Sequence, residues 1–180
     1  MPSLIRRRLL AAAAALPVLP AFAQPRPLTC GGLTEAQTEG PFFKTRTPLR
    51  ASLFEPDAKT PRLVVTGQVL SVQCTPVSHA LLDFWHADEN GEYDNAGFRY
   101  RGHQFTDAEG RYQLLTNVPA GYSGRARHIH VKVQAPGKRV LTTQLYVPGE
   151  AGNRRDGLYR RDLEMRIAKG ESAFDFVVEA

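Results

Sequence analysis

Two histidines one residue apart are the clearest candidates for metal chemistry in this sequence. The stretch from Arg127 to Val133 reads RHIHVKV, so polar and apolar side chains alternate as in a β-strand with one buried face. On such a strand His128 and His130 share one face, and two imidazoles on a rigid element can bind one metal ion. The same pattern also fits two histidines that only face solvent.

Two tyrosines in glycine-containing turns could supply a second kind of metal ligand. Tyr122 ends the turn PAGY six residues before His128, and Tyr93 ends the similar stretch NGEY. Each alone also fits packing at a sheet edge, and Tyr100 is near enough in sequence to rival Tyr93. Two phenols with two imidazoles suit Fe(III), because a phenol that ionises near pH ~10 needs a hard trivalent cation to become a phenolate at neutral pH. Zinc or copper(I) would favour sulfur or further imidazoles, so this set predicts non-haem Fe(III).

Short β-rich stretches, separated by turns rich in Pro, Gly, Asn and Asp, dominate the chain after residue 61 and have to position these side chains. Six strands are predicted, at Leu63 to Val72, Ala80 to Trp85, Gly110 to Thr116, His128 to Gln134, Val140 to Val147 and Ala173 to Glu179. One short helix is predicted at Leu158 to Lys169. The pattern predicts an all-β sandwich with two long connections, residues 24–61 and 86–107, and long connections are where functional residues tend to lie.

The first 23 residues have the features of an export signal. Three arginines at positions 6–8 precede an apolar stretch that is too short and too broken by proline to span a bilayer, and AFA at 21–23 matches a cleavage site. The adjacent arginines predict the twin-arginine route, with a simple secretory signal as the alternative. We therefore expect a signal peptide at 1–23, an N-terminal arm at 24–61, a catalytic β-sandwich at 62–180, and a periplasmic or extracellular location.

Cysteine usage and charge agree with an exported protein. Cys30 and Cys74 form an even pair, which predicts a disulfide in an oxidising compartment. The formal charge is +5, but without the three arginines of the leader 20 basic residues remain against 18 acidic ones. These are scattered along the chain, so no nucleic-acid partner is predicted, and no later segment predicts membrane association after cleavage.

The order and spacing of several short motifs resemble those of the intradiol ring-cleavage dioxygenases. The matching pieces are Thr38 to Phe42, Leu82 to Asp88 with Gly91 and Tyr93, Thr106 to Tyr112, Pro119 to Tyr122, Arg125 with His128 to His130, and Leu141 to Gln144. The resemblance covers nearly the whole mature chain and implies a β-sandwich of the prealbumin- or immunoglobulin-like kind with long active-site loops.

The resemblance implies specific roles for individual residues. Non-haem Fe(III) would be held by Tyr93, Tyr122, His128 and His130. Tyr122 matches the tyrosine that the family releases when substrate binds, so that it also serves as a base. Arg125 would stabilise negative charge on the substrate ring, and Gln144 would line the same pocket. Gly40 and Pro41 would form backbone walls of the pocket.

The implied reaction uses O2 to cleave a small aromatic diol between its two hydroxyl-bearing carbons and gives a muconate-type diacid. Catechol, hydroxyquinol, protocatechuate and larger catechols all remain candidate substrates. The helical N-terminal region with which the cytoplasmic members dimerise has no counterpart before residue 62, so a homo-oligomer would need another interface. Two rival interpretations are an exported prealbumin-like binding module without catalysis, and a copper or zinc protein that uses only His128 and His130.

Overall fold

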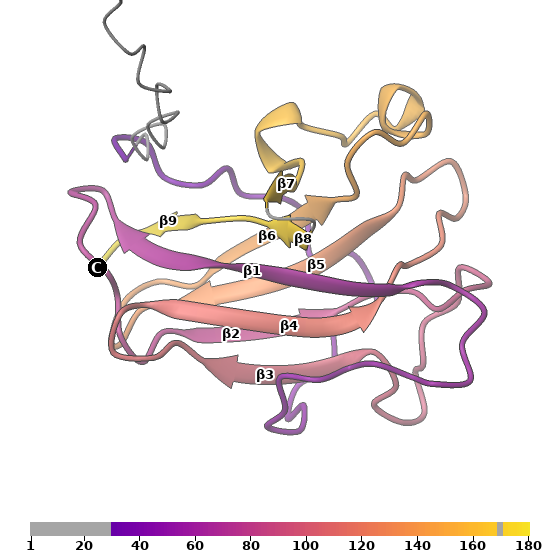
Figure 1. Ribbon diagram of the computed structural model, residues 1–180, viewed down its shortest axis with the longest axis horizontal. Helices are drawn as coiled ribbons and strands as arrows, with labels where there is room; N and C mark the ends of the chain where they lie inside the picture. The colour runs from indigo at the N-terminus through magenta and orange to yellow at the C-terminus, as the bar shows by residue number, and fades with distance from the viewer. Residues whose placement is uncertain (1–29, 169–170) are drawn as a thin grey trace, which may run out of the picture.

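The computed structural model describes residues 30–168 and 171–180, which form a sandwich of two β-sheets (Figure 1). One sheet contains β1 (Arg62–Ser71), β4 (Arg111–Asn117), β7 (Arg166–Ala168), β8 (Glu171–Ala173) and β9 (Phe176–Val178). The other contains β2 (Leu81–Trp85), β3 (Arg101–Phe105), β5 (His128–Gln134) and β6 (Leu141–Tyr146). The all-β sandwich predicted from the sequence is confirmed, whereas the expected signal peptide at 1–23 lies outside the described residues.

The first sheet is built around β1, and its strands follow the order β4-β1-β8-β7. Strand β1 pairs antiparallel with β4 over residues 62–68 and runs parallel to both β8 and β9. Val65 and Val69 of β1 are fully buried, because side chains of alternate residues in this strand point into the space between the sheets. This sheet provides one wall of the main hydrophobic core.

The second sheet carries the histidine pair, and its strands follow the antiparallel order β3-β2-β5-β6. Ile129, Val131 and Val133 of β5 are fully buried in the main core, as the alternation predicts. His128 and His130 lie on the opposite face, yet each is only 2% exposed. The interpretation of these two residues as solvent-facing histidines is therefore wrong, because other segments cover the outer face of this sheet.

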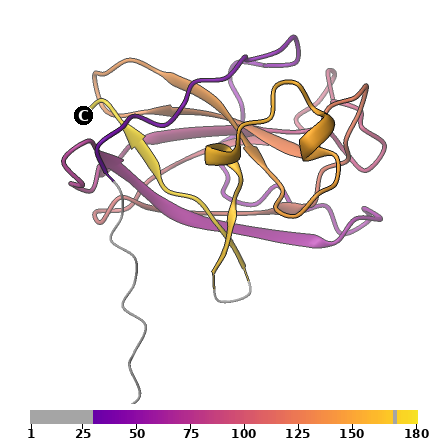
Figure 2. The ribbon, with the colours of Figure 1, turned by 90° about the horizontal axis from the view of Figure 1, so that it is seen from above.

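The described part of the N-terminal arm, residues 30–61, contributes to that cover without forming a regular strand. Its backbone donates hydrogen bonds from Thr34 to Val177 of β9 (2.9 Å) and from Gln37 to Thr142 of β6 (2.8 Å), so the arm follows the top of the sandwich in Figure 2. Farther along, Leu49 forms a bridge with β3 and Ser52 forms one with β4. Strands β6 and β3 are the two edges of the second sheet, so the arm crosses the outer face of this sheet between these contacts, and Gly40 lies next to His130 there.

The arm is also covalently attached to the sandwich. A disulfide joins Cys30 to Cys74, the pair that the sequence indicates, across a sequence separation of 44 residues. Cys74 lies in the turn that follows β1. The start of the described chain is thus fixed to the first sheet.

The predicted helix at 158–169 is wrong. The described part of this segment contains only the 3-10 turn η2 (Arg161–Leu163) and then β7, and another short 3-10 turn, η1 (Asn153–Arg155), precedes it. Met165 donates its backbone N–H to the carbonyl of Tyr146 in β6 (3.0 Å), and this tertiary hydrogen bond holds the chain in an extended conformation. Ile167, which a helical face would bury, is 65% exposed. Within the described ranges no helix is long and apolar enough to cross a membrane.

The predicted strands differ from the observed ones in two further places. The strand predicted at 173–179 is interrupted: Ala173 is the last residue of β8, and β9 covers only residues 176–178. Strand β3 was not predicted, because its sequence RGHQF contains little apolar periodicity. Its Gly102 is needed for close packing, since a β-carbon there would lie 2.8 Å from side-chain atoms of Arg50 and Leu53 in the arm.

Candidate metal centre

The four predicted metal ligands lie together at one end of the sandwich. His128 and His130 come from the start of β5, where the strand is flanked by the loop 86–100 after β2 and the loop 118–127 after β4 (right side of Figure 1). Tyr93 comes from the first of these loops and Tyr122 from the second. Segments far apart in the sequence thus supply two imidazoles from a rigid strand and two phenols from loops.

Asp88 fixes both loops. Its side-chain Oδ1 accepts hydrogen bonds from the backbone N–H groups of Asn90 (2.8 Å) and Glu92 (2.9 Å), which shapes the turn leading to Tyr93. Its backbone carbonyl accepts a hydrogen bond from Ala120 (3.1 Å), which attaches the second loop to the first. The two phenols are therefore positioned as a pair.

The donor atoms of the four side chains form a continuous chain of close contacts. The Nε2 atoms of His128 and His130 are 3.1 Å apart, and His130 Nε2 is 3.1 Å from the hydroxyl oxygen of Tyr93. That oxygen is 3.3 Å from the hydroxyl oxygen of Tyr122. All four tips thus point at one small region.

The hydrogen bond on the far side of His128 sets its tautomer. His128 Nδ1 lies 2.6 Å from the backbone carbonyl of Ala126, which can only accept, so Nδ1 carries the proton and Nε2 presents a lone pair to the site. Burial lowers the pKa of His128 to about 4 and lowers the pKa of His130 well below its ordinary value. Both imidazoles are therefore neutral at physiological pH, the form that binds metal ions.

The donor set fits a hard cation better than it fits an empty hydrogen-bonded cluster. Two neutral imidazoles that face each other with Nε2 atoms 3.1 Å apart need a proton or a cation between their lone pairs. The Nδ1 atom of His130 is buried and has no hydrogen-bond partner among the described residues, so no protein group there fixes the tautomer of this ring. Burial, and then the hydrogen bond with Tyr122, raise the pKa of Tyr93, so its phenolate form requires a strong Lewis acid.

Aromatic packing holds Tyr93 and His130 in place. The ring of Phe42 stacks on Tyr93 with centroids 4.4 Å apart, and Trp85 of β2 stacks on His130 with centroids 4.8 Å apart. Gly40 lies over the same histidine, because a β-carbon at Gly40 would be 3.7 Å from His130 Cε1. The backbone of the arm at Gly40 therefore forms one wall of the site, and Pro41 next to it is exposed.

Arg101 fastens the surroundings of Tyr93 from the protein interior. This arginine of β3 is only 1% exposed, and it donates hydrogen bonds to the backbone carbonyls of Phe42 (2.5 Å) and Asp94 (2.9 Å). Its guanidinium carbon lies 5.9 Å from the centre of the Tyr93 ring. One buried side chain thus ties the arm to the loop that carries Tyr93.

Arg125 and Gln144 form a second polar cluster. Arg125 donates from Nη2 to Gln144 Oε1 (2.5 Å), and Gln144 donates from Nε2 to the carbonyl of Thr38 (2.9 Å). On the other side, Arg125 Nε lies 3.0 Å from an Asp156 carboxylate oxygen. The structure therefore brings the predicted Arg125 and Gln144 into direct contact.

Sequence reasoning missed Asp156, Phe42 and Arg101. Phe42 falls within one of the family-like motifs, but the residue type alone does not predict that it stacks on Tyr93, 51 positions later. Asp156 lies in a stretch with no recognised motif. Tyr100, the rival of Tyr93, packs instead in the main core, where its ring centroid is 4.5 Å from that of His86.

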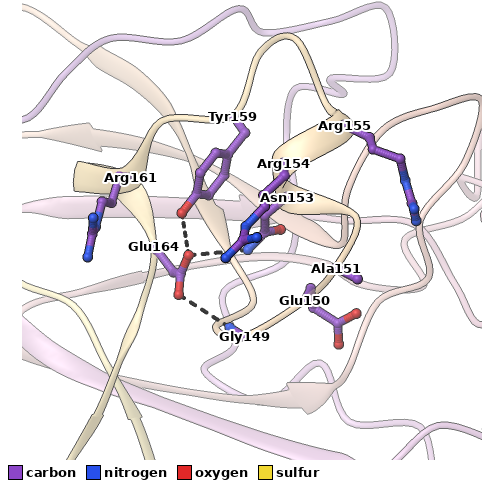
Figure 3. Close-up of a pocket in the computed structure, with 9 residues that line it drawn as sticks. All are labelled: Gly149, Glu150, Ala151, Asn153, Arg154, Arg155, Tyr159, Arg161 and Glu164. Atoms are coloured by element: carbon purple, nitrogen blue, oxygen red, sulfur yellow. Dashed lines mark hydrogen bonds between the residues drawn. The ribbon is translucent and has the colours of Figure 1, made fainter.

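A separate cavity of about 830 Å³ lies in the segment between β6 and β7 (Figure 3). Glu164 is at its centre and accepts hydrogen bonds from the backbone of Gly149 (3.3 Å), from Asn153 Nδ2 (3.3 Å) and from the hydroxyl of Tyr159. None of the residues predicted for the metal site or the substrate pocket lines this cavity. This cavity is therefore distinct from the candidate metal centre.

No group of three or more His, Cys, Asp or Glu side chains that could hold a metal ion occurs within residues 30–168 and 171–180. The pair His128 and His130 therefore finds no third ligand of these types in that part of the chain. The oxygen atoms near the two Nε2 atoms are the phenolic oxygens of Tyr93 and Tyr122.

Comparisons with known proteins identify the family of the chain. The profile of the family described as "Dioxygenase" matches residues 38–160. The catechol 1,2-dioxygenase 2 of Acinetobacter lwoffii is 33% identical over 172 residues, covering 76% of this chain and 62% of the relative. The chain therefore spans less than two thirds of the length of that relative.

Solved structures give the same picture. The dioxygenase domain of a dioxygenase and carbohydrate-binding protein fusion from Streptomyces sp. SirexAA-E is 50% identical, with a TM-score of 0.78 over 82% of this chain and 99% of that one. The hydroxyquinol 1,2-dioxygenase of Pseudomonas putida DLL-E4 is 25% identical, with a TM-score of 0.73 over 82% of this chain and 67% of that one. By its sequence, its fold and the relatives that share both, the chain belongs to the intradiol ring-cleavage dioxygenase family.

Proposed function

We propose that this protein is an iron(III)-dependent intradiol dioxygenase that opens a catechol-type ring between its two hydroxyl-bearing carbons with O2 and gives a muconate-type diacid. The observation that carries the proposal is the convergence of His128 Nε2, His130 Nε2 and the two tyrosine hydroxyls, with neighbouring atoms 3.1 to 3.3 Å apart. Relatives named as catechol, chlorocatechol and hydroxyquinol 1,2-dioxygenases support this substrate class.

Tyr93, Tyr122, His128 and His130 would hold the iron. When bound, Fe(III) supplies the Lewis acid that stabilises phenolates at neutral pH and makes a coordinated diol reactive toward O2. The protein contributes preorganisation: Ala126 keeps the Nε2 lone pair of His128 directed at the site, and Trp85 stacks on His130.

The two tyrosines differ in their freedom to exchange protons with a substrate. Tyr93 is 9% exposed and stacks on Phe42, whereas Tyr122 is half-buried and meets Phe42 edge to face, with centroids 6.4 Å apart. Tyr122 is therefore the better placed to accept a proton from a substrate hydroxyl on its phenolic oxygen, as a general base must.

Arg125 supplies a fixed positive charge near the donors. Its partner Gln144 is fully buried and is itself bound to the arm next to Gly40. A cation held in this way can stabilise negative charge that develops on a substrate ring, because it does not need to reorganise during the reaction. Gly40 and Pro41 of the arm would form a backbone wall of the pocket.

We also propose that the protein acts outside the cytoplasm after export by the twin-arginine route. The Cys30–Cys74 disulfide supports this location, because such bonds persist in oxidising compartments.

Purified mature protein loaded with iron tests the proposal. We expect about one iron per chain, a visible tyrosinate-to-iron absorption band, and consumption of about one O2 for each catechol converted to a ring-opened diacid. A colourless protein that stays colourless and inactive after iron loading would support the binding-module interpretation instead. Stoichiometric zinc or copper, with no gain of activity after iron loading, would support the interpretation as a copper or zinc protein.

A further inference from the structure

We propose that Asp156 is a positioning residue that fixes the guanidinium of Arg125 for the reaction. This inference rests on the proposed function, in which Arg125 stabilises charge on the substrate. It adds a residue from the segment between β6 and β7, which the sequence motifs do not reach.

The carboxylate of Asp156 is fully used in holding the residues around Arg125. Arg125 Nε lies 3.1 Å from Oδ1 and 3.0 Å from Oδ2. The backbone N–H of Ala126 donates to Oδ2 (2.9 Å), and that of Leu158 donates to Oδ1 (2.9 Å). The carboxylate therefore binds the arginine side chain, the backbone next to it and its own loop at the same time.

Burial makes this ion pair different from the surface pairs of the protein. The side chain of Asp156 is 1% exposed and that of Arg125 is 17% exposed. Water therefore screens the pair poorly, and removing one partner leaves a buried charge without compensation. Although burial raises it, the hydrogen bonds from Ala126, Leu158 and Arg125 bring the pKa of Asp156 below its ordinary value, so the carboxylate stays charged.

The ion pair also determines which nitrogen atoms of Arg125 are directed toward the proposed substrate pocket. With Nε bound to Asp156, Nη2 points to Gln144 Oε1 (2.5 Å) and lies 3.5 Å from the hydroxyl of Tyr146. An arginine side chain has several rotatable bonds, and a carboxylate bound to Nε restricts them. Loss of Asp156 should therefore let the guanidinium leave the position in which its charge is useful.

The same carboxylate is connected to the proposed metal site through one residue, Ala126. Asp156 accepts the N–H of Ala126, and the carbonyl of Ala126 accepts the Nδ1–H of His128. A test must therefore separate an effect on Arg125 from a general effect on the site. A double-mutant cycle makes this separation, because residues that act through one another give non-additive effects.

The experiment uses Asp156→Asn, Arg125→Gln and the double variant, all in the iron-loaded protein. We expect Asp156→Asn to lower kcat by about 10- to 100-fold with little change in KM, because a misplaced group loses transition-state rather than ground-state stabilisation. In the Arg125→Gln background, Asp156→Asn should lower kcat by no more than about 2-fold further. Fully additive losses, or loss of bound iron and of the visible band in Asp156→Asn, would overturn the proposal in favour of a purely structural role.

Asp175→Asn is the matched control. Asp175 also pairs with an arginine, Arg166, and accepts a backbone N–H from Gln68 (2.9 Å), but it lies between β8 and β9, next to the other sheet. We expect Asp175→Asn to leave kcat and KM unchanged. A loss equal to that of Asp156→Asn would mean that removing an aspartate from any aspartate–arginine pair has this effect, and the proposal would be wrong.

A second measurement needs neither activity nor a stable variant. In the wild-type protein, the Nε–H of Arg125 should exchange slowly with solvent in side-chain NMR spectra, because both Asp156 oxygens lie within hydrogen-bond distance of it. Fast exchange would refute the positioning of Arg125 even if Asp156→Asn failed to fold. Slow exchange in a protein without ring-cleavage activity would refute the proposed function and leave the ion pair intact.

Discussion

Replacing Tyr93 by Phe should remove a metal ligand while leaving the fold almost intact. The phenyl ring can stay stacked on Phe42, whose centroid is 4.4 Å away, so only the hydroxyl is lost. That hydroxyl contacts His130 Nε2 at 3.1 Å and the Tyr122 oxygen at 3.3 Å. At about 1 kcal/mol for each hydrogen bond, the iron-free variant should lose about 1 to 2 kcal/mol of stability. Its Tm should fall by about 2 to 8 °C.

The effect of the same change on activity should be much larger than its effect on stability. A ligand that takes part in the reaction should cost at least about 100-fold in kcat/KM, or about 2.7 kcal/mol of transition-state free energy. The assays are O2 uptake with catechol, the visible spectrum and iron content, with Tyr100→Phe in the main core as the matched control. An unchanged spectrum and rate in Tyr93→Phe would refute the ligand assignment, and an unfolded variant would refute the packing argument.

Three further predictions follow from particular distances and charges. Burial holds the pKa of His128 at about 4 against an ordinary 6.5, so this residue binds a proton in the unfolded chain and not in the folded one between these pH values. His128 alone should therefore lower the free energy of unfolding of the iron-free protein by up to about 3 kcal/mol as pH drops from 6.5 toward 4. Urea titrations measure this, and a free energy of unfolding that stays constant over this pH range would contradict the burial argument. Gly91→Ala should weaken iron binding, because the φ of Gly91 is +84° and the new β-carbon would lie 2.9 Å from the β-carbon of Tyr122. Gly137→Ala is the control: its φ is +71° and no atom lies within 4 Å of the new β-carbon, so backbone strain should lower the stability while the iron content stays normal. Reducing the Cys30–Cys74 disulfide should lower stability by about 4 kcal/mol in the chain-entropy account for a 44-residue separation, and denaturation with and without reductant measures this directly.

The features that could be predicted from the sequence depend on local order. The alternation RHIHVKV fixes which side chains of β5 share a face, and β5 begins and ends at the residues expected. The turn residues around Tyr93 and Tyr122 indicated loops because glycine and aspartate favour turns, and both tyrosines do lie in loops. Local patterns therefore sufficed to identify side chains that the fold then brings together.

The features that could not be predicted depend on contacts between distant segments. Strand β3 is defined by its partners and by the arm that packs against Gly102, neither of which is visible in five residues of mixed polarity. Asp156 becomes important only because its segment folds back onto Arg125, 31 positions earlier in the chain. The expected helix failed for the same reason, since a hydrogen bond to Tyr146 outweighs the weak helical periodicity around Met165.

The site combines three tightly held donors with one that is held more loosely, and this asymmetry has a physical origin. The two histidines come from a strand paired on both sides, and Tyr93 is covered by a stacked ring. Tyr122 instead precedes a tight turn in which Ser123 and Gly124 both have left-handed φ values, 44° and 78°. Such a turn fixes the backbone of Tyr122 while its ring makes only edge and tilted contacts with its neighbours. In the proposed catalyst, which must both hold a cation and accept a proton from its substrate, the phenol without a stacked ring is the one that can change partners without disturbing the other three.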